Sequence, residues 1–105
     1  MALTAGQVGD FGERHVEAWL RAKGFTNILR DTKQLGSTDI QADGSESILV
    51  QVKTAVHPDQ PAQLSADEIR DIKSRATKLG RVAYVARVTI DFAGGLVGTI
   101  AWSNP

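Results

Sequence analysis

The chain has 105 residues, of which 12 are basic and 12 acidic, so its formal net charge is zero. This length supports one domain with one modest core, and we expect a single domain over residues 1–105. No apolar run approaches the roughly 20 residues that a membrane span needs, and no signal peptide is expected, so a membrane partner is excluded. The absence of cysteine excludes disulfides and thiolate metal sites, and is typical of a cytoplasmic protein. The neutral balance argues against a strongly basic nucleic-acid coat, though not against an enzyme that contacts a few phosphates.

The first predicted element is an amphipathic helix over about residues 5–23. Thr4 and Gln7 fit a capping box at its start, and Gly24 is a stop signal at its end. An apolar stripe recurs at helical spacing along Val8, Phe11, His15, Val16, Ala18, Trp19, Leu20 and Ala22. The solvated face is predicted to carry Asp10, Arg14, Glu17 and Arg21.

Three glycines, Gly6, Gly9 and Gly12, interrupt this helix, although each costs about 1 kcal/mol relative to alanine. At 100° per residue, two of them flank the direction of Glu13, which places this carboxylate beside the apolar stripe. Three explanations stay open. Either the helix starts later, or a neighbouring element packs closely against it, or the bare strip leaves room for a ligand or phosphate beside Glu13.

A strand is predicted over residues 25–29, followed by a polar segment. In this segment Arg30 and Lys33 are either phosphate contacts or solvated loop residues. Residues 36–54 then predict two strands joined by a tight turn. The turn falls at Asp43-Gly44, where glycine is expected to supply a positive φ.

The second strand of this hairpin carries polar side chains within an apolar run. Side chains alternate along a strand, so Gln51 and Lys53 point to one face. Asp39 opens the neighbouring strand. An acid, an amide and a lysine are therefore expected to converge at the ends of two paired strands. A merely exposed polar face is the alternative.

The remaining elements follow a loop over residues 54–64, which contains two prolines. Ser65 and Glu68 form a capping box that opens a second helix, and Gly80 ends it. A buried strand is predicted over residues 82–90, and an edge strand over residues 96–102. Trp102, at its end, belongs either to a dimer interface or to the core.

Taken together, these pieces resemble the PD-(D/E)xK, or restriction-endonuclease-like, nuclease superfamily. The matching pieces are Gly12-Glu13 in the first helix, Gly-Ser-Thr-Asp-Ile at 36–40 and Gln-Val-Lys at 51–53. The chain is similar to archaeal Holliday-junction resolvases and Mrr-type restriction nucleases. The resemblance implies an α/β fold with an αβββαβ core, a mixed central sheet flanked by two helices and an extra C-terminal edge strand.

The resemblance also implies roles for individual residues. Asp39 would be the metal-binding acid, Lys53 the catalytic lysine and Glu13 the acid from the first helix. Gln51 stands where most members have glutamate, which removes one negative charge. Mg²⁺ or Mn²⁺ would take oxygen ligands from these side chains and from the Val52 carbonyl.

The function expected from these features is metal-dependent endonuclease cleavage of duplex or branched DNA. Two strands must be cut and each chain offers one site, so a symmetric homodimer is expected. Two alternatives stay open. One is a nucleic-acid-binding module of the same fold that has lost catalysis, and the other is a protein-interaction domain whose polar hairpin is only surface.

Overall fold

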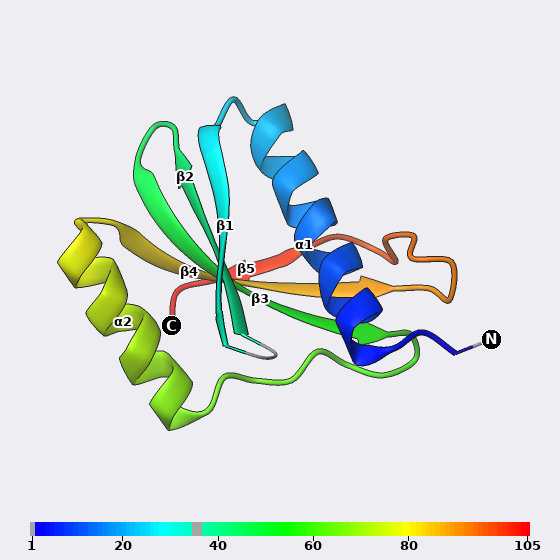
Figure 1. Cartoon of the computed structure of the whole chain (residues 1–105). Coiled ribbons are helices and arrows are strands. Elements are labelled where there is room, and N and C mark those ends of the chain that lie inside the picture. The colour runs from blue at the N-terminus through cyan, green and yellow to red at the C-terminus, as the bar shows by residue number, and fades with distance from the viewer. Residues whose placement is uncertain (1, 35–36) are drawn as a thin grey trace.

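The computed structural model describes residues 2–34 and 37–105, and their side chains outside residues 31–38. The element order is helix, three strands, helix, two strands, as the sequence predicts (Figure 1). The elements are α1 (Ala5–Ala22), β1 (Thr26–Gln34), β2 (Ser37–Asp43), β3 (Ser47–Val56), α2 (Ala66–Leu79), β4 (Val82–Ile90) and β5 (Ala101–Ser103). The chain therefore has an α/β fold.

The strands form one five-stranded mixed sheet in the order β1-β2-β3-β4-β5. Among the described strands, β3 and β4 are the one parallel pair, and α2 lies in the connection between them. The other three pairs of neighbouring strands are antiparallel. Figure 1 shows the two helices on either side of the twisted sheet. Neither helix in the described part of the chain is long and apolar enough to cross a lipid bilayer.

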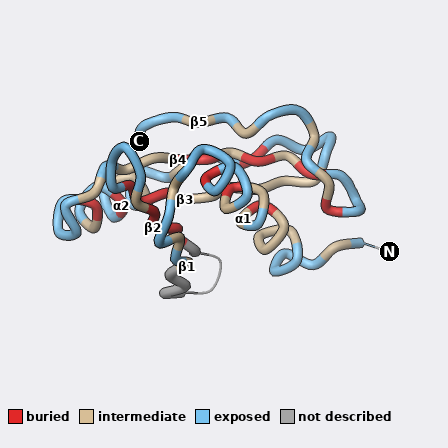
Figure 2. The backbone as a smooth tube through the Cα atoms, turned by 90° about the horizontal axis from the view of Figure 1, so that it is seen from above, coloured by how far each residue is buried: buried red, intermediate tan, exposed pale blue. Residues whose placement is uncertain are grey.

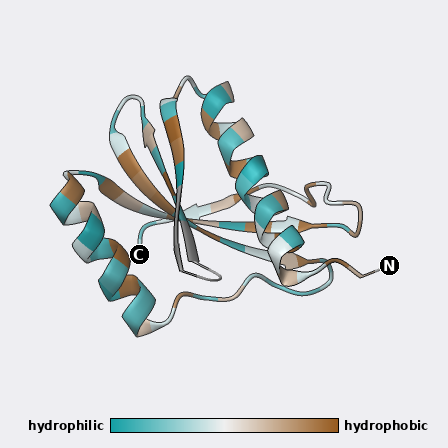
Figure 3. Ribbon diagram, viewed as in Figure 1, coloured by the Kyte–Doolittle hydropathy of each residue, from teal (hydrophilic) through white to brown (hydrophobic). Residues whose placement is uncertain are grey.

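The two faces of the sheet have separate cores. On the α1 face, Val16 and Leu20 pack with Ile40, Val50 and further buried residues of β2, β3 and β4. On the α2 face, a smaller cluster joins Leu49 to Ile72 and Ala76. Buried positions follow the central strands in Figure 2, and both helices alternate between hydrophilic and hydrophobic residues in Figure 3.

The predicted starts and ends of both helices are confirmed, because they depend on local hydrogen bonds and on glycine at the ends. Thr4 and Ser65 each accept the backbone N–H of the residue three positions on, and that residue's side chain accepts the cap N–H in return. Gly80 ends α2 in the left-handed region, and Gly24 follows α1 with φ of 87°.

Three strand boundaries were predicted wrongly. β1 continues through the segment predicted to be a polar loop, because residues 30–34 pair with β2. β3 continues to Val56, because it pairs in parallel with β4 up to Ile90. The final strand is shorter than predicted. Leu96 makes only an isolated bridge with Ile90, and Gly98 adopts a φ of 71° before β5 begins.

The hairpin turn after Asp43 is present, but the reason given for its glycine was wrong. Gly44 is not among the glycines with a positive φ. A Cβ atom there would lie 2.6 Å from Cδ1 of Phe25, so the position needs glycine because an aromatic ring lies against the backbone.

Candidate active site

Asp39 and Gln51 lie directly opposite one another in the antiparallel pairing of β2 and β3. Residues opposite in a sheet share a face, and Lys53 shares it too because it follows Gln51 by two positions. Both partners of the pair are buried, with Asp39 2% exposed and Gln51 3% exposed. The structure therefore brings together the acid, the amide and the lysine on adjacent strands.

The face that carries these residues is the one covered by α2. Arg75 of α2 donates from Nη1 to Oδ2 of Asp39, and its Nε lies 3.1 Å from Oδ2 of Asp71 on the same helix. The other carboxylate oxygen of Asp39, Oδ1, is buried without a hydrogen-bond partner among the described residues. The buried charge is therefore compensated from α2, and one of its oxygens is unused.

Lys53 is also held by α2. Its Nζ lies 2.5 Å from Oε2 of Glu68, which is the acidic member of the capping box. The hydrogen bond from Lys53, followed by the Ser65 N–H, lowers the pKa of Glu68 below its ordinary value. Glu68 therefore caps the helix and pairs with the strand lysine at the same time.

Glu13 lies on the other face of the sheet, where α1 packs. Its Oε1 is 3.4 Å from Nη1 of Arg30, whose guanidinium also contacts Asp10 at 2.7 Å and Glu17 at 2.8 Å. Hydrogen bonding to Arg30 lowers the pKa of Asp10. Glu17 was predicted to be solvated, but it is half-buried here because β1 passes beside it. Arg30 was expected to be either a phosphate contact or a solvated loop residue, and it lies instead in β1 among carboxylates.

A groove of about 1050 Å³ links the two faces at the far end of β3. The pairing of β2 with β3 runs only from Asp43–Ser47 to Asp39–Gln51, and β3 continues beyond it. The groove is lined by Glu13, Arg30 and Lys53, by the first turns of α1, and by residues of the loop after β3. Glu13 and Lys53 therefore share this groove, while Asp39 and Gln51 do not line it.

The three helix glycines have different roles. All three lie within α1, so a later start of the helix does not explain them. A Cβ atom on Gly12 would lie 1.8 Å from Oγ1 of Thr54, so close packing against β3 explains this glycine. Gly6 and Gly9 meet no such obstacle and line the groove beside Glu13.

His15 packs as the sequence predicts, with Nε2 donating to the carbonyl of Gly94 at 2.7 Å.

Part of the Gly-Ser-Thr-Asp-Ile segment at 36–40 cannot be placed. The side chains of residues 36–38 and of Lys33 lie outside those that the structure describes. No three histidine, cysteine or acidic side chains gather as a metal-binding group within the described chain.

The oxygen donors nevertheless fit one hard cation. Magnesium sites commonly use one or two carboxylates and complete the octahedron with water. The unpartnered Oδ1 of Asp39 and the amide of Gln51 opposite it supply donors of this kind. Arg75 holds the other oxygen of the same carboxylate, so a cation and this guanidinium compete for Asp39.

The sequence interpretation missed Glu68 and Arg75 as partners of the site. Glu68 was expected to act only as part of a helix cap. The separation of Glu68 and Arg75 by seven residues was the available signal, because it places both on one side of a helix, on the buried stripe that contains Ile72.

Comparisons with known proteins add no family assignment. No protein-family model matches this sequence, and no relative is found among curated proteins.

Proposed function

We propose that this domain is a metal-dependent endonuclease that hydrolyses DNA phosphodiester bonds. The observation that carries the proposal is the placement of Asp39, Gln51 and Lys53 on one face of two paired strands. The groove beside Lys53 adds support, because it is open to solvent and runs past a further carboxylate, Glu13. The αβββαβ element order and mixed sheet are consistent with a restriction-endonuclease-like fold.

In this proposal Mg²⁺ or Mn²⁺ would be held by Asp39, Gln51 and the Val52 carbonyl. Glu13 would hold an outer-shell water or a second cation from the groove. A divalent cation in such a site polarises a phosphoryl oxygen and lowers the pKa of bound water.

The side chains of the chain itself then have separate tasks. Lys53 reaches the groove with a positive charge, where it orients the attacking water or offsets charge that develops on the phosphate. Glu68 fixes the direction of Lys53 through their 2.5 Å contact. Arg75 holds the Asp39 carboxylate in place between the strands and α2.

The same ion pairs favour a second candidate, a nucleic-acid-binding module without catalysis. Asp39 is neutralised by Arg75, and Lys53 by Glu68. Permanent pairing of this kind would leave neither group available for hydrolysis. In that case nucleic acid would bind without any dependence on metal.

For the nuclease, we further propose a symmetric homodimer. A single chain offers one candidate site, and two-strand cleavage needs two sites related by the symmetry of the duplex. Light scattering of the free and DNA-bound protein tests this directly, and a monomer mass in both states contradicts it.

The decisive experiment incubates the protein with supercoiled plasmid, a four-way DNA junction and single-stranded DNA. Each substrate is tested in Mg²⁺, in Mn²⁺ and in EDTA. We expect cleavage with either metal and none in EDTA. Binding that persists in EDTA without cleavage in any metal would favour the second candidate, and absence of both would reject the two together.

Matched variants distinguish cleavage by this site from cleavage by a contaminating nuclease. Asp39→Asn and Lys53→Met should each abolish cleavage and keep the circular dichroism of the fold. Asp67→Asn and Lys73→Met are the controls, because they remove the same charges from exposed positions on α2. Wild-type cleavage by either site variant would contradict the assigned roles.

A further inference from the structure

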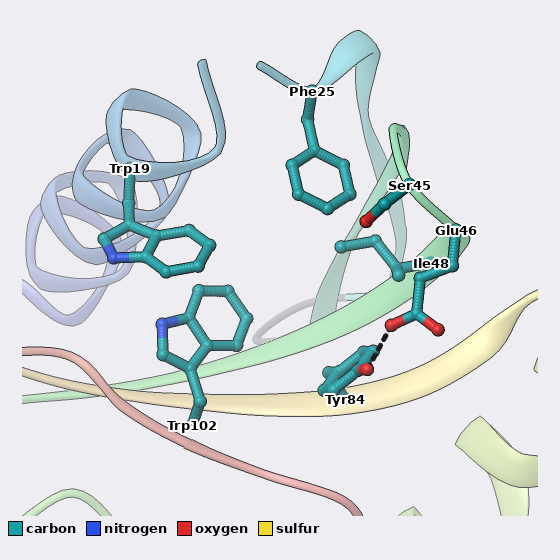
Figure 4. Close-up of a pocket in the computed structure, with 7 residues that line it drawn as sticks. All are labelled: Trp19, Phe25, Ser45, Glu46, Ile48, Tyr84 and Trp102. Atoms are coloured by element: carbon teal, nitrogen blue, oxygen red, sulfur yellow. Dashed lines mark hydrogen bonds between the residues drawn. The ribbon is translucent and has the colours of Figure 1, made fainter. Parts of the chain in front are cut away.

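A second cavity, of about 420 Å³, lies on the α1 face of the sheet. It lies at the end of α1 opposite to the groove, between that end of the helix, the turn after β2, and strands β4 and β5. Four aromatic rings surround it, those of Trp19, Phe25, Tyr84 and Trp102 (Figure 4). The remaining lining residues are Ser45, Glu46 and Ile48.

The rings are held by contacts within the chain. The centroids of Trp19 and Trp102 are 4.7 Å apart, and Tyr84 meets Trp102 edge-on at 6.4 Å. The Phe25 ring lies against the backbone of Gly44, where a Cβ would be only 2.6 Å away. The cavity therefore exists before any ligand binds, which lowers the conformational cost of binding.

A carboxylate borders this aromatic space. The hydroxyl of Tyr84 donates to Oε1 of Glu46 at the edge of the cavity (Figure 4). Among the described residues, the lining contains no lysine, arginine or histidine that would balance this charge. Aromatic ring faces are themselves negative, so the cavity combines two sources of negative potential.

One ring of the cavity already attracts a cation from this chain. Nζ of Lys23 lies 5.5 Å from the centroid of Trp19, although Lys23 does not line the cavity. Trp19 is 36% exposed, so its ring is also open to a ligand from solvent. The chemistry of the site thus matches a positively charged group with an apolar surface.

We propose that this cavity binds a small quaternary ammonium ion, with its methyl groups against the four rings and Glu46 balancing its charge. Such cages of aromatic rings are suited to alkylated ammonium groups, which are cationic and weakly hydrated. A nucleotide fits less well, because its phosphate would approach Glu46 with no basic side chain of the lining to neutralise it. The site is separate from the candidate nuclease site, and the proposal does not depend on nuclease activity.

Intrinsic fluorescence provides a direct test, because the chain has only two tryptophans and both line the cavity. Tetramethylammonium and choline are titrated against the fluorescence and against the two indole N–H signals in the NMR spectrum. The neutral analogue 3,3-dimethylbutan-1-ol has almost the shape of choline without its charge. Adenosine serves as a fourth probe, for stacking of a base.

We expect saturable changes with both cations, and binding of the neutral alcohol at least about tenfold weaker. Glu46→Gln keeps an acceptor for the Tyr84 hydroxyl and removes the charge, so choline affinity should fall severalfold. Trp19→Leu should weaken choline binding as well, reported by Trp102 alone. Asp67→Asn, an exposed carboxylate on α2, should have no effect.

Three results would overturn the proposal. Equal binding of choline and the neutral alcohol would identify an apolar cavity without charge selectivity. Saturable binding of adenosine but not of the cations would assign the cavity to nucleobases. Unchanged indole signals in the presence of both cations would show that this cavity binds no such ion.

Discussion

Arg75 on α2 and Asp39 on β2 form an ion pair across the boundary between helix and sheet, 36 residues apart in the sequence. The carboxylate is 2% exposed and the arginine side chain 14% exposed. Such a pair contributes little net stability relative to apolar residues, but breaking one side leaves an uncompensated buried charge. The pair therefore fixes α2 over the candidate active site.

Replacement of this arginine tests the relationship. Arg75→Met should lower the free energy of unfolding by about 3 kcal/mol, because the Asp39 carboxylate stays buried without its partner. The double variant Asp39→Asn/Arg75→Met should recover most of the loss, since it removes both charges. Urea unfolding of the three proteins measures the difference. If Arg75→Met is as stable as the wild type, the ion pair does not exist in solution.

The helix glycines offer a matched pair of substitutions. Gly12→Ala should destabilise the protein by about 1–3 kcal/mol, because its Cβ would overlap with Thr54 on β3. Gly9→Ala should stabilise it by about 0.5–1 kcal/mol, since the nearest atom to its Cβ is the flexible Glu13 carboxylate at 3.6 Å. Thermal unfolding reports both changes. If both substitutions change the stability in the same direction, the close contact between α1 and β3 is contradicted.

Much of the fold could be predicted from the sequence because its signals are local. The capping residues Thr4 and Ser65 and the strand over residues 82–90 depend on neighbours a few positions away. The convergence of Asp39 with Lys53 also followed from alternation along two strands joined by a short turn. Their common face needed no knowledge of the rest of the chain.

What the sequence left undecided is which helix covers which face. Glu13 was expected to approach the site from the first helix, yet α1 packs on the opposite face of the sheet from Asp39. Glu13 shares the groove with Lys53, but Asp39 does not line it. The partners Glu68 and Arg75 come from α2, whose position depends on the parallel crossover between β3 and β4. The aromatic cavity was missed for the same reason, because its rings come from four separate segments.

The contact between Lys53 and Glu68 predicts a specific dependence on pH. Because the folded-state pKa of Glu68 lies below its ordinary value of 4.5, its contribution is present above that pH. The contribution is lost as the pH falls through the lowered pKa. Glu68→Gln keeps the capping acceptor and removes the charge, so it should cost about 1 kcal/mol or less at pH 7.

The difference in unfolding free energy between the wild type and Glu68→Gln should therefore shrink below about pH 4.5. Denaturant unfolding between pH 7 and strongly acidic solution measures it. Asp67→Asn removes a neighbouring exposed charge and serves as the control. A difference that stays constant over this range would show that the charge of Glu68 is not the source of the effect.

The final prediction concerns Gln51, the proposed metal ligand whose side chain carries no charge. Gln51→Glu places a second carboxylate directly opposite Asp39 at a position 3% exposed. Two buried like charges repel, so the variant should be less stable than the wild type in EDTA. Hard cations favour charged oxygens, so Mg²⁺ should bind at least about tenfold more tightly to the variant and restore its stability.

Calorimetry and thermal unfolding with and without Mg²⁺ measure these two effects, and Gln41→Glu is the control. Gln41 lies on the strand face of Asp39 but pairs with Leu49 and not with a proposed ligand. Turnover then separates two roles of Lys53, because the added carboxylate favours its protonated form. If the variant binds Mg²⁺ more tightly and cleaves more slowly, Lys53 accepts a proton. If it binds Mg²⁺ more tightly and cleaves at an equal or higher rate, Lys53 neutralises charge. Identical Mg²⁺ affinities for the wild type and Gln51→Glu would remove Gln51 from the metal site.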